Sequence, residues 1–290
     1  MVFHPVLENK AVRDWLGDIM PVWTLLDEKS FMALQHPPSH DEAAIRLAID
    51  LKIEEIDQSP VARNAIILLR AGAISPGLKL TAAGNLSRKV VAQMWDVITW
   101  PGFDKEETPR ICKVINEPDF FPLFFLRCLV DSAGLMKRYK DHHRTTRIGK
   151  EVIQEKWQGA LQALLFDAAF WIANLDYMGR GSLNGWPQHQ AGIILWGLSI
   201  AAKEWTTPEQ LVRQCVIPFE KIGGGFTDRE ASALEGLILR PLVYFGMLEE
   251  HEKHIGDSRY RHVSFYRKTP LFDRFLTFNV SLEGKGQTRH

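Results

Sequence analysis

The sequence has few cysteines, no excess of charge of either sign and no long uninterrupted apolar run. Its 290 residues include three cysteines, Cys112, Cys128 and Cys215, which are odd in number and form no C-x-x-C pair. This usage argues against a disulfide framework and a structural zinc site, and it predicts a reduced, cytoplasmic protein. The 35 basic and 35 acidic residues cancel, so any binding of nucleic acid must come from a local patch.

Neither membrane insertion nor secretion is expected. The longest apolar stretches, such as residues 120–130, are interrupted by Pro122 and Arg127, and they fall short of the roughly 20 residues that span a bilayer. The N-terminus lacks the basic and apolar segments of a signal peptide. Hydrophobic residues make up 46% and charged residues 24%, which are ordinary values for a folded globular protein and exclude disorder throughout.

Charge is distributed unevenly along the chain. Residues 61–150 hold 15 basic and 8 acidic side chains, a net charge of +7, whereas residues 1–60 hold 5 and 11, a net charge of −6. Eight side chains of the basic region form the candidate contact with nucleic acid: Lys137, Arg138, Lys140, His142, His143, Arg144, Arg147 and Lys150. A cluster of this kind is either a solvated face or a surface that contacts phosphate, and the sequence leaves both interpretations open.

Helix signals outnumber strand signals. Ser39 and Glu42 have the spacing of a capping box, which predicts a helix from Glu42 to Ile56. The other expected elements are helices over residues 150–175 and 231–245, a short helix that starts at Thr269, and strands over residues 78–80, 135–139 and 260–267.

One pattern occurs three times, near residues 65–98, 121–150 and 234–276. An apolar helix ends in a glycine and an apolar pair, a strand and a polar tip follow, and a second strand ends at a threonine that starts a new helix. Glycine adopts the left-handed conformation that ends a helix, and threonine caps the next one. This order is typical of the second half of a winged helix-turn-helix, although an α-rich protein without a winged domain can also contain it.

We therefore predict a mainly α-helical fold of repeated winged-helix-like units, with short two-stranded β-wings and a central helical bundle. Residues 1–60 are expected to form an acidic helical segment, and residues 61–150 two winged-helix-like units. Residues 151–290 are expected to form a helical bundle that ends in a third unit.

Three short phrases of the sequence resemble an uncharacterised family of bacterial proteins. They are Leu78 to Val91, Pro241 to Leu248 and Arg267 to Phe272. The resemblance implies a shared fold, and it supplies no catalytic residues, cofactor or partner.

No metal, cofactor or catalytic residue is expected. The two prolines between His36 and His40 keep these histidines off a regular helix, and the run from His251 to His254 is one residue short of the zinc-protease motif H-E-x-x-H. Neither pair has an identifiable third ligand. The sequence also lacks the G-x-S-x-G motif of a serine nucleophile, and it has no pair of acidic residues that converges on one helix face. These absences favour a protein that is not an enzyme.

Two functions stay open. The first is a DNA-associated regulator or accessory protein that binds duplex DNA through the basic unit near residues 121–150. The second is a scaffold or adaptor whose winged-helix units contact proteins, because one fold can serve both purposes. The basic middle of the chain favours the first function and the neutral total charge favours the second. Self-association is left open.

Overall fold

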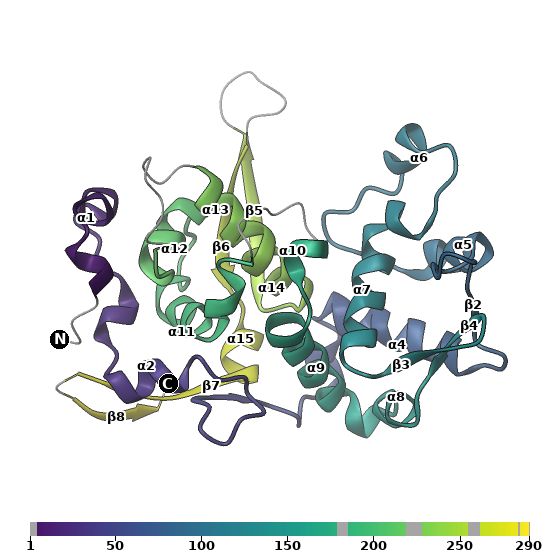
Figure 1. Cartoon of the computed structure of the whole chain (residues 1–290), viewed down its shortest axis with the longest axis horizontal. Coiled ribbons are helices and arrows are strands. Elements are labelled where there is room, and N and C mark those ends of the chain that lie inside the picture. Colours follow the sequence, from purple (N-terminus) through teal and green to yellow (C-terminus); the bar gives the residue numbers. More distant parts are fainter. Residues whose placement is uncertain (1–4, 179–184, 219–227, 255–261, 284, 290) are drawn as a thin grey trace. The chain divides into compact units, whose positions relative to one another are not determined.

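A computed structural model describes residues 5–178, 185–218, 228–254, 262–283 and 285–289 (Figure 1). The chain divides into two compact units, unit 1 with residues 1–47 and 175–290 and unit 2 with residues 48–174. The prediction of a mainly α-helical protein with short β-strands is confirmed. Within the described ranges, no helix combines the length and the apolar character needed to cross a bilayer.

Unit 2 is mostly helical and holds one small sheet. Its helical elements are α3 (Ile53–Ile56), α4 (Pro60–Ala73), α5 (Arg88–Val97), α6 (Thr108–Ile111), η3 (Glu117–Asp119), α7 (Phe121–Ser132), α8 (Arg147–Val152), η4 (Glu155–Trp157), α9 (Gln158–Asp167) and the π-helical turn η5 (Ala168–Ile172). Its strands are β2 (Leu78–Lys79), β3 (Met136–Tyr139) and β4 (His142–Thr145). The strands are antiparallel in the order β2-β4-β3, so β4 lies in the middle of the sheet.

Helix α4 lies against both the sheet and α9. Ser59 caps its first turn by accepting a hydrogen bond from the Ala62 amide, and the buried Ser59 hydroxyl donates to Gln162 of α9 at 2.9 Å. On the sheet side, a side chain added at Gly72 would have its Cβ 2.8 Å from the Thr145 hydroxyl oxygen. A glycine is therefore required for α4 to pack this closely on β4.

Unit 1 combines helices with a three-stranded sheet and a separate hairpin. Its helical elements are η1 (Pro5–Glu8), α1 (Lys10–Leu16), η2 (Val22–Leu25), α2 (Glu28–Ala33), α10 (Leu175–Met178), η6 (Gln188–Gln190), α11 (Ala191–Ala201), α12 (Pro208–Cys215), α13 (Asp228–Leu234), the π-helical turn η7 (Glu235–Leu239), α14 (Arg240–Tyr244) and α15 (Pro270–Phe275). Its strands are β1 (Ile45–Leu47), β5 (Leu248–His254), β6 (His262–Lys268), β7 (Leu276–Leu282) and β8 (Lys285–Arg289). Strands β1, β7 and β8 form one sheet in that order, and β5 and β6 form the hairpin.

Helix α11 is the core helix of unit 1. Its residues from Ala191 to Ser199 are buried without interruption, which is typical of a helix surrounded by protein on all sides. Gly197 lets α12 approach, because a Cβ at this position would lie 3.0 Å from the Cβ of Cys215. Directly after α12, the Val216 carbonyl accepts a hydrogen bond from the indole of Trp23 in η2 at 3.2 Å.

The two hairpins are held in the same way. Gly134 and Gly246, with φ angles of 67° and 74°, each end the helix that precedes a hairpin. The hydroxyl of Thr146 donates to the Gly134 carbonyl at 3.0 Å, and the hydroxyl of Thr269 donates to the Gly246 carbonyl at 2.7 Å. The predicted order of helix, glycine, hairpin, threonine and helix is therefore present near residues 121–150 and 234–276.

The first predicted copy of this pattern, near residues 65–98, differs from the prediction. Gly72 lies inside α4 instead of ending it, and β2 has no hairpin partner of its own. It pairs instead with β4, with Leu78 opposite His143. The segments predicted as two separate units within residues 61–150 thus contribute strands to a single sheet.

The predicted helix from Glu42 to Ile56 is wrong. Residues 45–47 form β1, in which Ile45 is fully buried opposite Phe278 of β7, and only residues 53–56 are helical. Pairing with a strand that is remote in sequence outweighs the local helix pattern. The hairpin strands expected over residues 135–139 and 260–267 and the short helix after Thr269 are confirmed as β3, β6 and α15.

We predict that Gly134→Ala destabilises the fold by roughly 1–2 kcal/mol, because a left-handed residue with a Cβ is strained. Nothing lies within 4 Å of the added Cβ, so the cost comes from the backbone alone. Gly134→Asn should cost less, since asparagine tolerates this conformation. Gly236→Ala is the control, because it too meets no atom within 4 Å and its φ is not left-handed. Urea unfolding monitored by circular dichroism measures the differences, and equal midpoints for Gly134→Ala and Gly236→Ala would contradict the prediction.

Candidate nucleic-acid interface

The residues predicted to contact nucleic acid lie on the hairpin of β3 and β4 and on the helix that follows it. Tyr139 pairs with His142, so Lys140 and Asp141 form a two-residue turn. Lys140 has a φ of 55°, a left-handed conformation that is uncommon outside glycine, asparagine and aspartate. Strained positions of this kind are frequent at functional sites.

Most of the predicted contact residues reach the surface. Five cations are exposed on the hairpin and on α8: Lys137, Arg138, Lys140, Arg147 and Lys150. His142 and Arg144 are half-buried. The Nε of Arg138 donates to the Lys140 carbonyl at 3.1 Å, and the Nε of Arg144 donates to the Pro76 carbonyl at 2.7 Å. These two bonds hold both guanidinium groups against backbone carbonyls.

His143 does not reach this surface, so its predicted role as a contact with nucleic acid is set aside. Its side chain is 2% exposed, and its Nε2 lies 2.6 Å from the carboxylate of Asp131 on α7. Thr145 is buried on the same face of β4, and its hydroxyl donates to the Leu69 carbonyl of α4 at 2.6 Å. Alternation along a strand explains the difference, since His143 and Thr145 face inward while their neighbours face out. The two residues anchor the hairpin to α4 and α7.

Tyr139 belongs to the surface although sequence reasoning passed over it. Its side chain is 47% exposed. The guanidinium carbon of Arg144 lies 4.3 Å from the centre of its ring, and the Nζ of Lys140 lies 5.8 Å away. Cations over an aromatic face are attracted by the ring. The signal in the sequence was an aromatic residue inside a run of basic ones.

Asp141 brings a negative charge to the turn. Its carboxylate is bonded to the ammonium of Lys79 on β2, and it lies 2.8 Å from Nδ1 of His142. The hydrogen bond from Lys79 is the main cause that lowers the pKa of Asp141 to about 2. Asp141 is therefore ionised at neutral pH, and it offsets one of the neighbouring cations.

A buried ion pair fixes the segment beneath the hairpin. Glu117 is 1% exposed, and both of its carboxylate oxygens bind Arg127 of α7, at 2.8 and 2.6 Å. Glu117 also accepts a hydrogen bond from the Leu86 amide, while Arg127 donates to the Gly84 carbonyl at 2.9 Å. Because a buried charge needs such partners, the pair ties the β2–α5 connection to α7.

The described strands of the unit 1 hairpin carry both signs of charge in equal number, with the cations Lys253, Arg267 and Lys268. Strand β5 carries Glu249, Glu250 and Glu252. Glu249 forms an ion pair with Arg267 of β6 at 2.9 Å, and Glu250 lies 2.7 Å from the buried Tyr266 hydroxyl. Because these charges cancel, the described strands of this hairpin lack the surplus of cations that attracts DNA phosphates.

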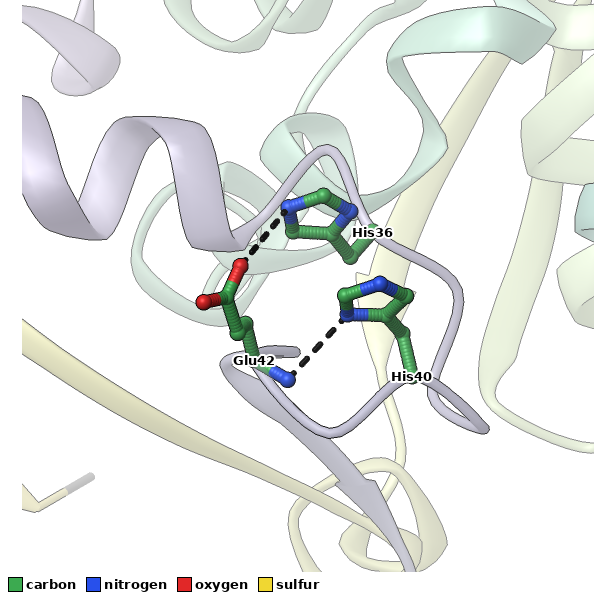
Figure 2. A group of neighbouring side chains, drawn as sticks. All are labelled: His36, His40 and Glu42. Atoms are coloured by element: carbon green, nitrogen blue, oxygen red, sulfur yellow. Dashed lines mark hydrogen bonds and ion pairs between the residues drawn. The ribbon is translucent and has the colours of Figure 1, made fainter.

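A separate cluster of potential metal ligands lies on the loop between α2 and β1. The imidazole rings of His36 and His40 are stacked, with centroids 4.2 Å apart and planes 8° from parallel (Figure 2). Nε2 of His36 lies 3.9 Å from Oε2 of Glu42. One ligand atom from each of the three side chains lies within 4.8 Å of the others. Among the described residues, these three side chains are the one group of histidine, cysteine or acidic residues that lie close enough together to share a metal ion.

Comparison with known proteins identifies the basic unit. Residues 57–158 match the Y4jL N-terminal domain family. The chain is 29% identical over 109 residues to the uncharacterized protein y4jL of Sinorhizobium fredii. The alignment covers 38% of this chain and 49% of that protein, so the chain spans about half the length of the curated relative it matches. No solved structure matches the chain.

The Y4jL-type region, residues 57–158, contains α4 to α8 and the whole sheet of unit 2. The predicted resemblance to an uncharacterised bacterial family is thereby confirmed here. Of the three phrases that carry this resemblance, residues 78–91 lie within the match. The phrases at residues 241–248 and 267–272 lie outside it.

We predict that Lys79→Ala raises the pKa of Asp141 from about 2 toward the ordinary value of 3.8, because it removes the main hydrogen bond to the carboxylate. Since the folded pKa is depressed, the Lys79–Asp141 contact stabilises the fold above the unfolded pKa of about 4. This contribution is lost as the pH falls toward 2. A carbon-detected NMR titration of the carboxyl group measures the pKa, and Lys137→Ala is the control on the same hairpin. An unchanged pKa in Lys79→Ala would disprove the assignment.

Proposed function

We propose that unit 2 binds duplex DNA through the hairpin of β3 and β4. The observation that carries the proposal is the exposed group of Lys137, Arg138 and Lys140 around Tyr139 at the hairpin tip. Lysine and arginine side chains neutralise phosphates and release the counterions that surround DNA. The tip offers these charges on a rigid two-stranded element, and Arg147 and Lys150 extend them along α8.

The order of elements supports a winged-helix interpretation of unit 2. Helices α4, α5 and α7 and strands β2, β3 and β4 follow the order typical of a winged helix-turn-helix, in which β3 and β4 form the wing. A related order recurs in unit 1 from α11 to β6, where Thr206 pairs with Tyr266 in the place of a first strand. On this basis the described residues contain two winged-helix-like units, and of their described strands those of the unit 2 wing have the surplus of cations.

Helix α7 stands where a winged-helix protein has its recognition helix, but it is poorly equipped to read bases. Its outward positions include Arg127 and Asp131, and Arg127 is already paired with Glu117. Six of its twelve residues are buried. The contacts with DNA would therefore come from the wing and would go to the phosphate backbone, which fixes position and carries little sequence information. We expect weak preference among DNA sequences.

The second candidate function is protein binding by the hairpin of β5 and β6. Its acidic strand β5 favours a basic partner over DNA. This function uses unit 1 and does not compete with the proposal for unit 2. If the chain binds no DNA at low salt, protein binding by this hairpin becomes the better interpretation.

We predict that the triple variant Lys137→Glu, Arg138→Glu and Lys140→Glu weakens binding to a 20-base-pair duplex by more than about tenfold at low salt. Loss of three phosphate contacts should also reduce the slope of log affinity against log salt by about 3. Glutamate at position 140 has the same backbone strain as lysine, so the fold should tolerate the change. Fluorescence anisotropy with a labelled duplex at two salt concentrations measures both quantities.

The matched control is Lys10→Glu, Lys29→Glu and Lys203→Glu, three exposed lysines of unit 1 with the same change in net charge. It should keep most of the affinity, because non-specific attraction by total charge is weaker than contact at the hairpin. Equal losses in the two variants would show that total charge, and not the hairpin, governs binding. Asp141→Asn should raise the affinity, since it removes the opposing charge at the turn.

We also predict that Tyr139→Ala weakens DNA binding about fivefold or more, whereas Tyr139→Phe leaves it nearly unchanged. The ring can pack against a sugar of the DNA backbone, and it holds the cations of Arg144 and Lys140 over its face. The phenylalanine variant keeps the ring and the cations above it and removes only the hydroxyl group. Competition anisotropy with the same duplex compares the variants, and an unaltered affinity in Tyr139→Ala would exclude a role for the ring.

A further inference from the structure

We propose that His36, His40 and Glu42 form a site for a divalent transition-metal ion, with Zn²⁺ as the best fit. The site lies in unit 1 on the loop between α2 and β1, and it is independent of the DNA-binding hairpin. Figure 2 shows the three side chains grouped on this loop, with the two rings stacked and Glu42 beside them. Two imidazoles and one carboxylate are a ligand set typical of zinc sites that keep a fourth position open to water.

The distances are within reach of coordination. Tetrahedral Zn²⁺ with ligands at about 2.0–2.1 Å places the ligand atoms about 3.4 Å from one another. Nε2 of His36 and Oε2 of Glu42 are 3.9 Å apart, and all three ligand atoms lie within 4.8 Å. Because an imidazole lone pair lies in the ring plane, two nearly parallel rings cannot both point at one ion, so binding requires the ring of His40 to leave the stack; His40 and Glu42 are exposed and have room to turn. The ion would join three groups that the loop already gathers.

A hydrogen bond orients the ring of His40 within the loop. The Glu42 amide donates to Nδ1 of His40 at 3.1 Å, which holds the ring beside Glu42. Nε2 is the nitrogen of this ring that is left for an ion while the hydrogen bond is kept.

The loop is fixed at both ends, so the ligands are held near one another before any ion binds. The Ala44 amide donates to the Ala33 carbonyl at 3.1 Å, which closes the loop at its base. At one end Leu34 is fully buried, and a Cβ at Gly192 of α11 would lie 1.9 Å from the Leu34 carbonyl oxygen. At the other end Ile45 is fully buried in β1. Inside the loop, the His40 amide donates to the Pro37 carbonyl at 2.9 Å.

The sequence pattern alone could not supply this site. The run H-P-P-S-H supplies the two histidines, but its spacing identifies no third ligand. Glu42 was assigned to a helix cap because it follows Ser39 by three residues. No helix forms there, so the carboxylate is free to turn toward His36.

The test is titration of the full chain with Zn²⁺ by isothermal calorimetry at neutral pH, followed by titration with Co²⁺ to record its absorption spectrum. We expect one equivalent of Zn²⁺ to bind at micromolar concentration and Co²⁺ to show the intense visible bands of tetrahedral coordination. The double variant His36→Phe and His40→Phe keeps the stacked rings and removes the ligand nitrogens, so it should fold and should bind more than about tenfold more weakly. Glu42→Gln keeps both imidazoles and should weaken binding by a smaller factor.

The control variant is His189→Ala, which removes an exposed histidine of the same unit outside the loop and should bind as the native chain does. Binding should also weaken below about pH 6, where protons compete with the ion for imidazole nitrogens. Absence of Zn²⁺ binding by the native chain would overturn the proposal. Equal binding by the native chain and the double phenylalanine variant would overturn it too, because the ion would then lie elsewhere.

Discussion

Strand β4 is the element on which the surface of unit 2 depends. It lies between β2 and β3, and its two inward residues connect it to two helices: His143 binds Asp131 of α7, and Thr145 binds the Leu69 carbonyl of α4. A two-stranded hairpin alone is marginal in water. Because β4 is held on both edges and on one face, the hairpin can present several like charges at its tip without losing its shape.

Ion pairs within unit 2 divide its basic residues into two kinds. Arg127 is neutralised by the buried Glu117, and Lys79 is paired with Asp141. Lys137, Arg138 and Lys140 stand exposed at the tip. A count of charges along the sequence treats all of these cations alike. The structure assigns the first kind to the fold and leaves the second kind available for a ligand, which is the physical basis of the proposal that the hairpin contacts DNA.

The two hairpins show how one arrangement can serve different partners. Both follow a left-handed glycine and end at a threonine whose hydroxyl bonds to that glycine's carbonyl. Their described strands differ in charge: β3 and β4 carry a surplus of cations, whereas the glutamates of β5 are balanced by cations on β5 and β6. Backbone geometry is set by the few residues that need special conformations, whereas the exposed side chains are free to vary. Of the two hairpins, the one in unit 2 lies within the match to the Y4jL N-terminal domain, and the one in unit 1 lies outside it.

Local patterns in the sequence were enough to predict the mainly helical fold, the hairpins near residues 135–145 and 248–268, and most of the exposed cations of the candidate site. These features follow from short-range rules: glycine ends a helix, threonine starts one, and side chains alternate along a strand. Contacts between remote segments decided the rest. Residues 45–47 became a strand because β7 pairs with them, β2 joined the sheet of a later hairpin, His143 was buried against Asp131, and Glu42 came to lie beside His36. Each of these outcomes depends on a partner whose position no local pattern contains.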